Sequence, residues 1–303
     1  MKNKIIGLFL IVVSFTICSC KDCPASNSGN TENLKVASFN IQLAPPNALE
    51  KFYWHTRKDA AKKLLSYHRF DIWGSQETYL HQIESVIPSG YGFVGVGRDD
   101  GSTEGEYSPI FYNKDKFEVI KSGTFWISET PEKVSYGWGA KHRRICTWGE
   151  FKSKKTGKIF FFFNTHLDHR VVKAKEEGVK LLKKKIEEIA GGKTYFLTGD
   201  FNIHLGDEKL KPLVESPDFI HAKDIAKLTY APEGGTYHAY TGIARAFIDY
   251  IWVSKNVKVN KYAVLTDRIG KLKYDYSLES KKQRQKDVDY ASDHFPIGAE
   301  VEF

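Results

Sequence analysis

The chain has 303 residues, of which 41% are hydrophobic and 27% charged, and its formal net charge at pH 7 is +8. This balance is typical of a globular protein with a large core. The modest positive charge favours anionic substrates. It does not by itself indicate nucleic-acid binding, because many lysines lie in solvated runs such as Lys183–Lys185.

The N-terminal segment has the pattern of a targeting signal. Lys2 and Lys4 precede the apolar run Ile5–Ile17, which is shorter than a membrane span. The run ends in ICSC, which resembles a bacterial lipobox with Cys20 as the lipidated residue; a lone transmembrane anchor is the alternative. We expect residues 1–19 to be a lipoprotein signal peptide. Their removal would lower the net charge to +6, since they include two lysines and no acidic residue.

Residues 20–33 are polar and rich in Ser, Asn and Gly, so we expect a flexible tether. The mature protein would then be anchored to a membrane of the bacterial cell envelope, on the periplasmic or the outer-membrane face. No disulfide framework is expected, because Cys146 is the one cysteine outside the signal and the tether. Residues 34–303 contain no linker, and we expect them to form a single domain.

Beyond the tether, apolar strand-like segments alternate with helical patterns. Helices are expected over Ala48–Tyr67, Tyr79–Val86 and Val171–Ala190, and the third of these has a clear apolar face. A charged excursion is expected over Gly270–Asp289. The expected strands are Leu34–Ile41, Phe70–Gly74, Tyr91–Gly97, Tyr107–Tyr112, Phe117–Ile127, His142–Phe151, Lys158–Thr165, Tyr195–Leu197, Phe247–Ser254, Lys258–Leu265 and Ile297–Phe303.

Polar side chains recur at or near the ends of these strands. A single one of them is consistent with a turn residue or a structural histidine. Their recurrence favours a cleft at one edge of a sheet, where strand ends meet. The residues of this constellation are Asn40, Glu77, His166, Asp200, Asn202, Asp249, Asp293 and His294.

The ligand types in this constellation indicate a hard cation. No His-Glu-x-x-His motif and no Cys-x-x-Cys pair is present, so zinc is not favoured. Oxygen ligands suit Mg²⁺, Mn²⁺ or Ca²⁺. Such an ion with open positions assists phosphoryl chemistry, and nearby histidines can serve the phosphate or the attacking water. Neither a G-x-S-x-G nor a Walker A motif occurs.

Taken together, these segments resemble the endonuclease/exonuclease/phosphatase (DNase I-like) superfamily. That superfamily includes abasic-site endonucleases, inositol polyphosphate 5-phosphatases and bacterial sphingomyelinases. The resemblance implies an α/β fold, a four-layer αββα sandwich of two packed, mostly antiparallel sheets flanked by helices. The matching segments, in the family's order, are Ala37–Ile41, Gly74–Glu77, Asn164–His169, Leu197–Asn202, Ile248–Ser254 and Ser292–Ile297.

The resemblance also implies roles for single residues. Glu77 matches the principal metal ligand, and Asn40 and Asp293 match residues close to the same Mg²⁺ or Mn²⁺ ion. Asp200 and Asn202 match the pair that orients the attacking water and the phosphate.

Three further positions match residues around the scissile phosphate. His294 resembles the histidine that contacts this phosphate, and Asp249 the carboxylate that holds this histidine. His166 resembles the second active-site histidine. Glu106 matches a glutamate that, in the DNase I branch, supports that second histidine.

The sequence departs from the family in two places. An Arg often precedes Ile-Asp-Tyr in the family, whereas this chain has Phe247 there and Arg245 two positions earlier. Gln42 lies where some relatives have a carboxylate, which puts a second metal site on that side in doubt. Asp168, His169 and Arg144 are candidates for lining the cleft. A solvent-facing histidine and an arginine at a strand edge are equally consistent with the sequence.

We therefore expect a metal-dependent phosphoesterase that uses direct in-line attack of water. The substrate stays open, with a small phosphorylated compound favoured over nucleic acid because the charge is modest and spread out. An extracellular nuclease is the alternative. From another class, a non-catalytic envelope binding protein is a further alternative, and Trp126, Trp138 and Trp148 would suit a carbohydrate ligand. We expect a monomer.

Overall fold

The central strand β7 (Ile159–His166) shows how the layers of the fold are held together. The computed structural model describes residues 31–303 except 50, 52, 232–233 and 269–289. In β7, Phe160 and Phe162 are buried in the core between two sheets, whereas Phe161 and Phe163 pack beneath a helix. Because successive strand side chains point to opposite faces, one run of phenylalanines serves two interfaces.

Two mixed sheets form the inner layers in the described part of the chain. One has the strand order β10-β12-β13-β1-β2-β4-β3, and the other β5-β6-β7-β8-β11-β9. Most neighbouring strands are antiparallel, whereas β1 runs parallel to β2, β7 to β8 and β10 to β12. The first sheet consists of β1 (Asn33–Asn40), β2 (Ile72–Gln76), β3 (Tyr91–Val94), β4 (Ile110–Asn113), β10 (Leu228–Tyr230), β12 (Lys258–Val264) and β13 (Ile297–Glu302). The second consists of β5 (Phe117–Trp126), β6 (Ile145–Ser153), β7, β8 (Tyr195–Asp200), β9 (Ile220–His221) and β11 (Asp249–Val253).

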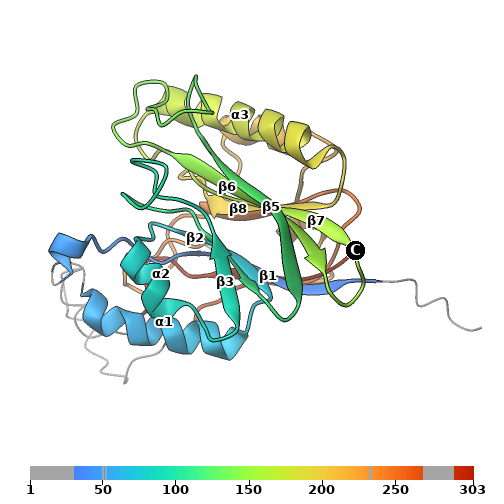
Figure 1. Ribbon diagram of the computed structural model, residues 1–303, viewed down its shortest axis with the longest axis horizontal. Helices are drawn as coiled ribbons and strands as arrows, with labels where there is room; N and C mark the ends of the chain where they lie inside the picture. The colour runs from blue at the N-terminus through green and yellow to red at the C-terminus, as the bar shows by residue number, and fades with distance from the viewer. Residues whose placement is uncertain (1–30, 50, 52, 232–233, 269–289) are drawn as a thin grey trace, which may run out of the picture. The chain divides into compact units, whose positions relative to one another are not determined.

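Helices cover the outer face of each sheet, which confirms the predicted αββα sandwich (Figure 1). Helix α3 (Val172–Ala190) packs its apolar face on β7 and β8. Helices α1 (Trp54–His68) and α2 (Leu80–Val86) cover β1, β2 and β4. The short helices are η1 (Pro46–Ala48), η2 (Glu208–Leu210), α4 (Lys211–Val214) and α5 (Ala222–Ile225).

Several elements begin later than the sequence pattern predicts, and the backbone explains two of them. Helix α1 begins at Trp54 because Tyr53 adopts a left-handed conformation with φ +52°. Strand β4 begins at Ile110 because Pro109 has no amide hydrogen to donate to a sheet.

The folded part begins slightly before the predicted boundary at residue 34. Glu32 exchanges backbone hydrogen bonds of 3.0 and 3.1 Å with Phe303. The predicted signal peptide, Cys20 and most of the tether lie outside the described residues, as does most of the predicted excursion over Gly270–Asp289. Within the described part, none of the helices combines the length and apolar character that a membrane span requires.

We predict that Phe162→Ala lowers the free energy of unfolding by about 3–5 kcal/mol, because it opens a cavity between the two sheets. Phe162 is fully buried. Ile159→Ala in the same strand is the control, since Ile159 is 39% exposed and its loss should cost less than about 1 kcal/mol. Urea unfolding followed by circular dichroism measures both. Equal losses would contradict the central position of β7.

Candidate active site

The register of the strands brings the predicted residues to one edge of the sandwich. In the second sheet His166 lies beside Asp200, and Asp200 lies beside Asp249, so three neighbouring strands each present one polar residue. In the first sheet Asn40 lies beside Gln76, and Glu77 follows directly. The two sheets therefore contribute to the same site.

The Asn40 side chain links the two halves of this site. Its Nδ2 donates to Glu77 Oε1 at 3.2 Å and to Asp200 Oδ2 at 2.9 Å. Glu77 has left-handed backbone with φ +57°, an uncommon conformation for a residue other than glycine. Its second oxygen, Oε2, accepts a 2.9 Å hydrogen bond from the Leu43 amide. Both oxygens of Glu77 are thus held in place.

Negative charge is crowded around Glu77. Burial raises the pKa of Glu77, and the neighbouring carboxylates of Glu106 and Asp293 raise it further. Ligand atoms of Glu77, His166 and Asp200 all lie within 4.8 Å of one another. An oxygen-rich set of carboxylates that raise one another's pKa fits a hard divalent cation, which would offset their repulsion.

Asp200 is almost completely buried at the end of β8. Burial and the charge of Asp249 raise its pKa to about 7, although His294 opposes this shift. Its Oδ1 accepts a 2.9 Å hydrogen bond from the Asn202 amide. The Asn202 side chain turns back toward His166, with Nδ2 3.0 Å from His166 Nε2. Asp200 and Asn202 therefore form one hydrogen-bonded unit with the histidine.

The two predicted histidines carry opposite pKa shifts. Burial would lower the pKa of His294, but Asp249 and Asp200 outweigh it and raise that pKa to about 10. His294 Nδ1 lies 2.9 Å from Asp249 Oδ2, and its Nε2 lies 3.8 Å from Asp200 Oδ2. For His166, burial and the nearby Arg144 hold the pKa well below its usual value. At pH 7 His294 is a cation and His166 is neutral.

Basic side chains line the other side of the site. Arg144, just before β6, is 5% exposed, and its Nη2 lies 3.1 Å from His169 Nδ1. Its Nε is 4.0 Å from an Asp168 oxygen. Among the residues that the structure describes, Arg144 Nη1 has no hydrogen-bond partner. A buried guanidinium with unused donors is suited to bind an anion or a hydroxyl group.

The acidic and basic sides face one cavity of about 470 Å³. Of the predicted site residues, Asn40, Asp168 and Asp249 support this cavity from behind, while the others line it. The lining residues are Gln42, Leu43, Glu77, Arg98, Glu106, His142, Arg144, His166, His169, Asp200, Asn202, Tyr237, Ile248, Asp293 and His294.

The structure changes the expected partner of Glu106. Its two oxygens accept bonds of 2.7 and 2.8 Å from Arg98, so the carboxylate pairs with an arginine and not with His166. Asp168 also has a structural contact, because its Oδ1 accepts the amides of Arg170 and Val171 just before α3.

Sequence reasoning missed Arg98, His142 and Tyr237 as lining residues. Arg98 and Tyr237 lie in loops that lack strand patterning, and the one usable signal was an acidic residue eight positions after Arg98. His142 was expected to begin a strand, but β6 begins three residues later, at Ile145. The tryptophans serve packing instead. Trp126 is 7% exposed and donates its indole N–H to the Arg98 carbonyl at 2.8 Å, and none of the three predicted tryptophans lines the cavity.

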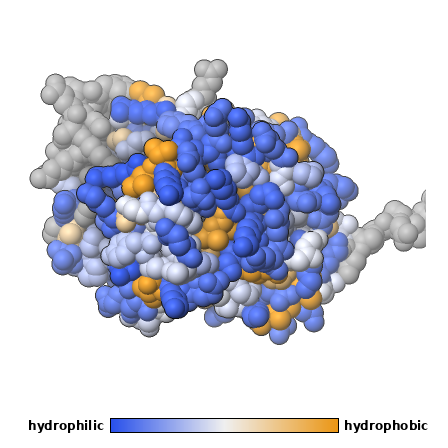
Figure 2. Space-filling view, turned by 90° about the horizontal axis from the view of Figure 1, so that it is seen from above, coloured by the Kyte–Doolittle hydropathy of each residue, from blue (hydrophilic) through white to orange (hydrophobic). Residues whose placement is uncertain are grey.

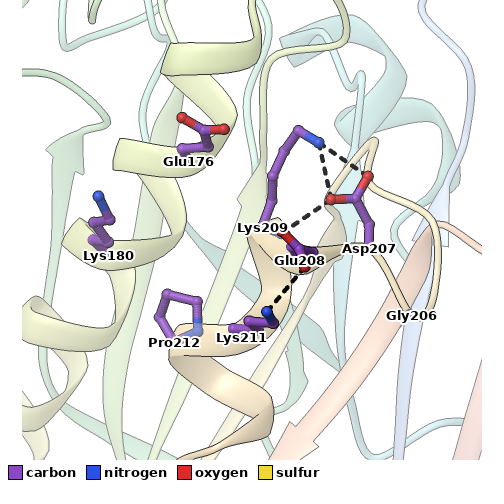
Figure 3. Close-up of a pocket in the computed structure, with 8 residues that line it drawn as sticks. All are labelled: Glu176, Lys180, Gly206, Asp207, Glu208, Lys209, Lys211 and Pro212. Carbon is purple, nitrogen blue, oxygen red and sulfur yellow. Dashed lines mark hydrogen bonds and ion pairs between the residues drawn. The ribbon is translucent and has the colours of Figure 1, made fainter.

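A second groove, of about 550 Å³, lies between α3 and the segment from Gly206 to Pro212 (Figure 3). Its charges are largely paired with one another. Lys209 binds Asp207 at 2.8 and 3.0 Å, and Lys211 binds Glu208 at 3.0 Å. Exposed, self-paired charges contribute little binding energy, so this groove is not the candidate site.

Comparisons with known proteins agree with this geometry. The model of the endonuclease/exonuclease/phosphatase family matches residues 37–294. An endonuclease/exonuclease/phosphatase family protein of Bacteroides thetaiotaomicron is 37% identical, with a TM-score of 0.81, over 90% of this chain and 98% of that one. A mannosyl-6-phosphatase of the same organism is also 37% identical, with a TM-score of 0.79, over 89% and 100% of the two chains.

One more distant structural match shows the fold alone. The human nocturnin catalytic domain is 18% identical, with a TM-score of 0.63, over 89% of this chain and 94% of that one. An uncharacterised protein of Acanthamoeba polyphaga mimivirus is 28% identical over 58% of this chain and 69% of the viral protein. The matched residues, the sandwich and the convergent acidic and histidine groups lead to one assignment. The chain belongs to the endonuclease/exonuclease/phosphatase family and is a metal-dependent hydrolase of phosphate esters.

Proposed function

We propose that this protein is a phosphatase that removes a phosphate group from a small phosphorylated compound, and that a sugar phosphate is the best candidate. The observation that carries the proposal is the division of the cavity into two sides. One side holds Glu77, Asp200 and cationic His294, which suit the phosphate. The other holds Arg144 and His169, which offer hydrogen bonds to the rest of the substrate.

The size of the cavity supports a small substrate. A volume of about 470 Å³ lies within the range of small-molecule sites. The similar mannosyl-6-phosphatase of Bacteroides thetaiotaomicron supports the same class. On the face seen in Figure 2, apolar residues form small separate patches among hydrophilic ones. A phospholipid substrate would call for a larger exposed apolar surface.

Mg²⁺ or Mn²⁺ suits this site, with Glu77 as the main ligand, Asp293 beside it, and Asn40 close to the same ion and fixing Glu77 through its side-chain amide. When bound, such an ion polarises a phosphoryl oxygen and offsets charge that develops on it. Asp293 also lines the cavity, and its charge raises the pKa of Glu77. Both observations support a shared ion.

Asp200 is suited to take a proton from the attacking water. A carboxylate with a pKa of about 7 is both partly deprotonated and appreciably basic at neutral pH. Asn202 is fixed to it through the 2.9 Å backbone hydrogen bond, and its side-chain amide lies between His166 and the Leu167 carbonyl. This arrangement orients a water without a covalent enzyme intermediate.

His294 supplies positive charge where the transition state gains negative charge. Its Nδ1 is held by Asp249, so its Nε2 side faces Asp200 and the cavity. Fixed, buried charges of this kind stabilise a transition state strongly because they need no reorganisation. The envelope location predicted from residues 1–19 is part of this proposal. At that location the enzyme would act on nutrients or cell-surface compounds outside the cytoplasm.

We predict that the purified protein releases inorganic phosphate from mannose 6-phosphate with Mg²⁺ or Mn²⁺ and loses this activity in EDTA. His294→Ala should reduce kcat by about 10²–10³-fold, because it removes a preorganised charge at the transition state. Full activity in EDTA would contradict metal dependence. Faster cleavage of double-stranded DNA than of sugar phosphates would contradict the proposal of a small substrate and would favour nucleic acid.

We predict that Asp249→Asn lowers the pKa of His294 by about 1–3 pH units, since Asp249 is the main source of its upward shift. The pKa is read from the histidine NMR signals of the metal-free protein across a pH series. Asp168→Asn is the control, because Asp168 holds Arg144 and not His294. Equal shifts in both variants would contradict the assigned Asp249–His294 pair.

We predict that Arg144→Gln raises KM for a sugar phosphate at least tenfold while a phosphate-only substrate analogue binds with little change. The reason is that Arg144 lies on the side away from the carboxylates and offers unused donors there. Lys180→Gln, in the second groove, is the matched control. An unchanged KM in Arg144→Gln would show that the Arg144 side of the cavity takes no part in substrate recognition.

A further inference from the structure

Gln42 occupies a buried position between a tyrosine and a candidate metal ligand. Its Oε1 accepts a 2.6 Å hydrogen bond from the Tyr240 hydroxyl, and its Nε2 donates to Asp293 Oδ2 at 2.9 Å. Gln42 is 4% exposed and Tyr240 2%. An ionised carboxylate can only accept hydrogen bonds, so the NH₂ end of the amide must face Asp293 and the oxygen must face Tyr240. The three side chains form a directed chain.

The backbone of Gln42 is held as firmly as its side chain. It has φ +60°, an uncommon value for a residue with a side chain. Its amide donates to Asn40 Oδ1 at 2.9 Å, and its carbonyl accepts from Gln82 at 3.0 Å and from buried Arg57 at 3.2 Å. Because the backbone is fixed, the amide group can turn only through its side-chain torsions, and Tyr240 fixes those.

Tyr240 directly follows two residues, His238 and Ala239, whose amides bind the backbone of Asp293. The Asp293 carbonyl accepts the amides of His238 at 2.9 Å and Ala239 at 3.1 Å. Ala239 and Tyr240 both have positive φ, +49° and +63°. Strained backbone of this kind persists where the surrounding contacts determine it, and it is frequent near functional sites.

We propose that Tyr240 and Gln42 are positioning residues that orient Asp293 for the divalent cation of the proposed function, on which this inference rests. Partners of ligand side chains contribute to metal affinity because they fix the orientation of the ligand before the ion binds. A neutral amide does this without adding charge to the crowded carboxylates. A carboxylate at position 42 would repel Asp293 instead.

The test measures Mn²⁺ binding by isothermal titration calorimetry, without any substrate. Tyr240→Phe removes one hydroxyl and keeps the ring, and Gln42→Met keeps the approximate volume and removes both hydrogen bonds. Each should raise the dissociation constant for Mn²⁺ about 10–100-fold. The double variant should be no weaker than Gln42→Met alone, because Tyr240 acts through Gln42.

The control is Tyr195→Phe, which likewise removes the hydroxyl of a buried tyrosine. Tyr195 lies at the other end of β8 from Asp200, and its hydroxyl donates to a backbone carbonyl. It should leave Mn²⁺ affinity unchanged even if its melting temperature falls as much as that of Tyr240→Phe. Wild-type affinity in Tyr240→Phe would overturn the positioning role while the proposed function stands. Additive losses in the double variant would overturn the route through Gln42. Absence of Mn²⁺ binding by the wild type would overturn both proposals.

Discussion

The burial of several carboxylates at one edge of the sandwich is the constraint on which the site depends. Asp200 and Asp249 are each 1% exposed, and Asp293 is 6% exposed. Charges in such places are costly unless they are paired or coordinate a metal. The buried cation His294 binds Asp249 directly. The carboxylates of Glu106 and Asp293 raise the pKa of Glu77, and a bound divalent cation would relieve this repulsion.

The two sheets contribute to this edge in different ways. The second sheet places His166, Asp200 and Asp249 in line across three neighbouring strands, so their spacing follows from the strand separation. The first sheet contributes Asn40 and Glu77, and the Asn40 amide joins them to Asp200 across the interface. The packing between the sheets, including Phe160 and Phe162, therefore sets the distance between the two halves of the site.

The sequence predicted much of this arrangement because its signals were local. The apolar segment Lys158–Thr165 predicted a strand, and polar residues at strand ends predicted a shared cleft. Side-chain partners were harder to predict, because they depend on contacts between loops. Glu106 lies eight residues after Arg98 and pairs with it, whereas its resemblance to a family position suggested a histidine. Arg98 and His142 were missed for the same reason, as both lie in loops of the structure, although the sequence pattern placed His142 at the start of a strand.

The opposite charges of the two histidines show why residue type alone does not determine chemistry. His294 faces three carboxylates, which raise its pKa to about 10. His166 is equally buried, and there burial itself lowers the pKa, which the nearby Arg144 and Arg98 lower further. The cavity is therefore divided into a cationic histidine beside the carboxylates and a neutral histidine beside the arginines. In the proposed function, a phosphate beside the carboxylates meets positive charge from His294, whereas Arg144 faces the rest of the substrate. The neutral His166 adds no charge there, and its Nε2 lies 3.0 Å from the Asn202 amide.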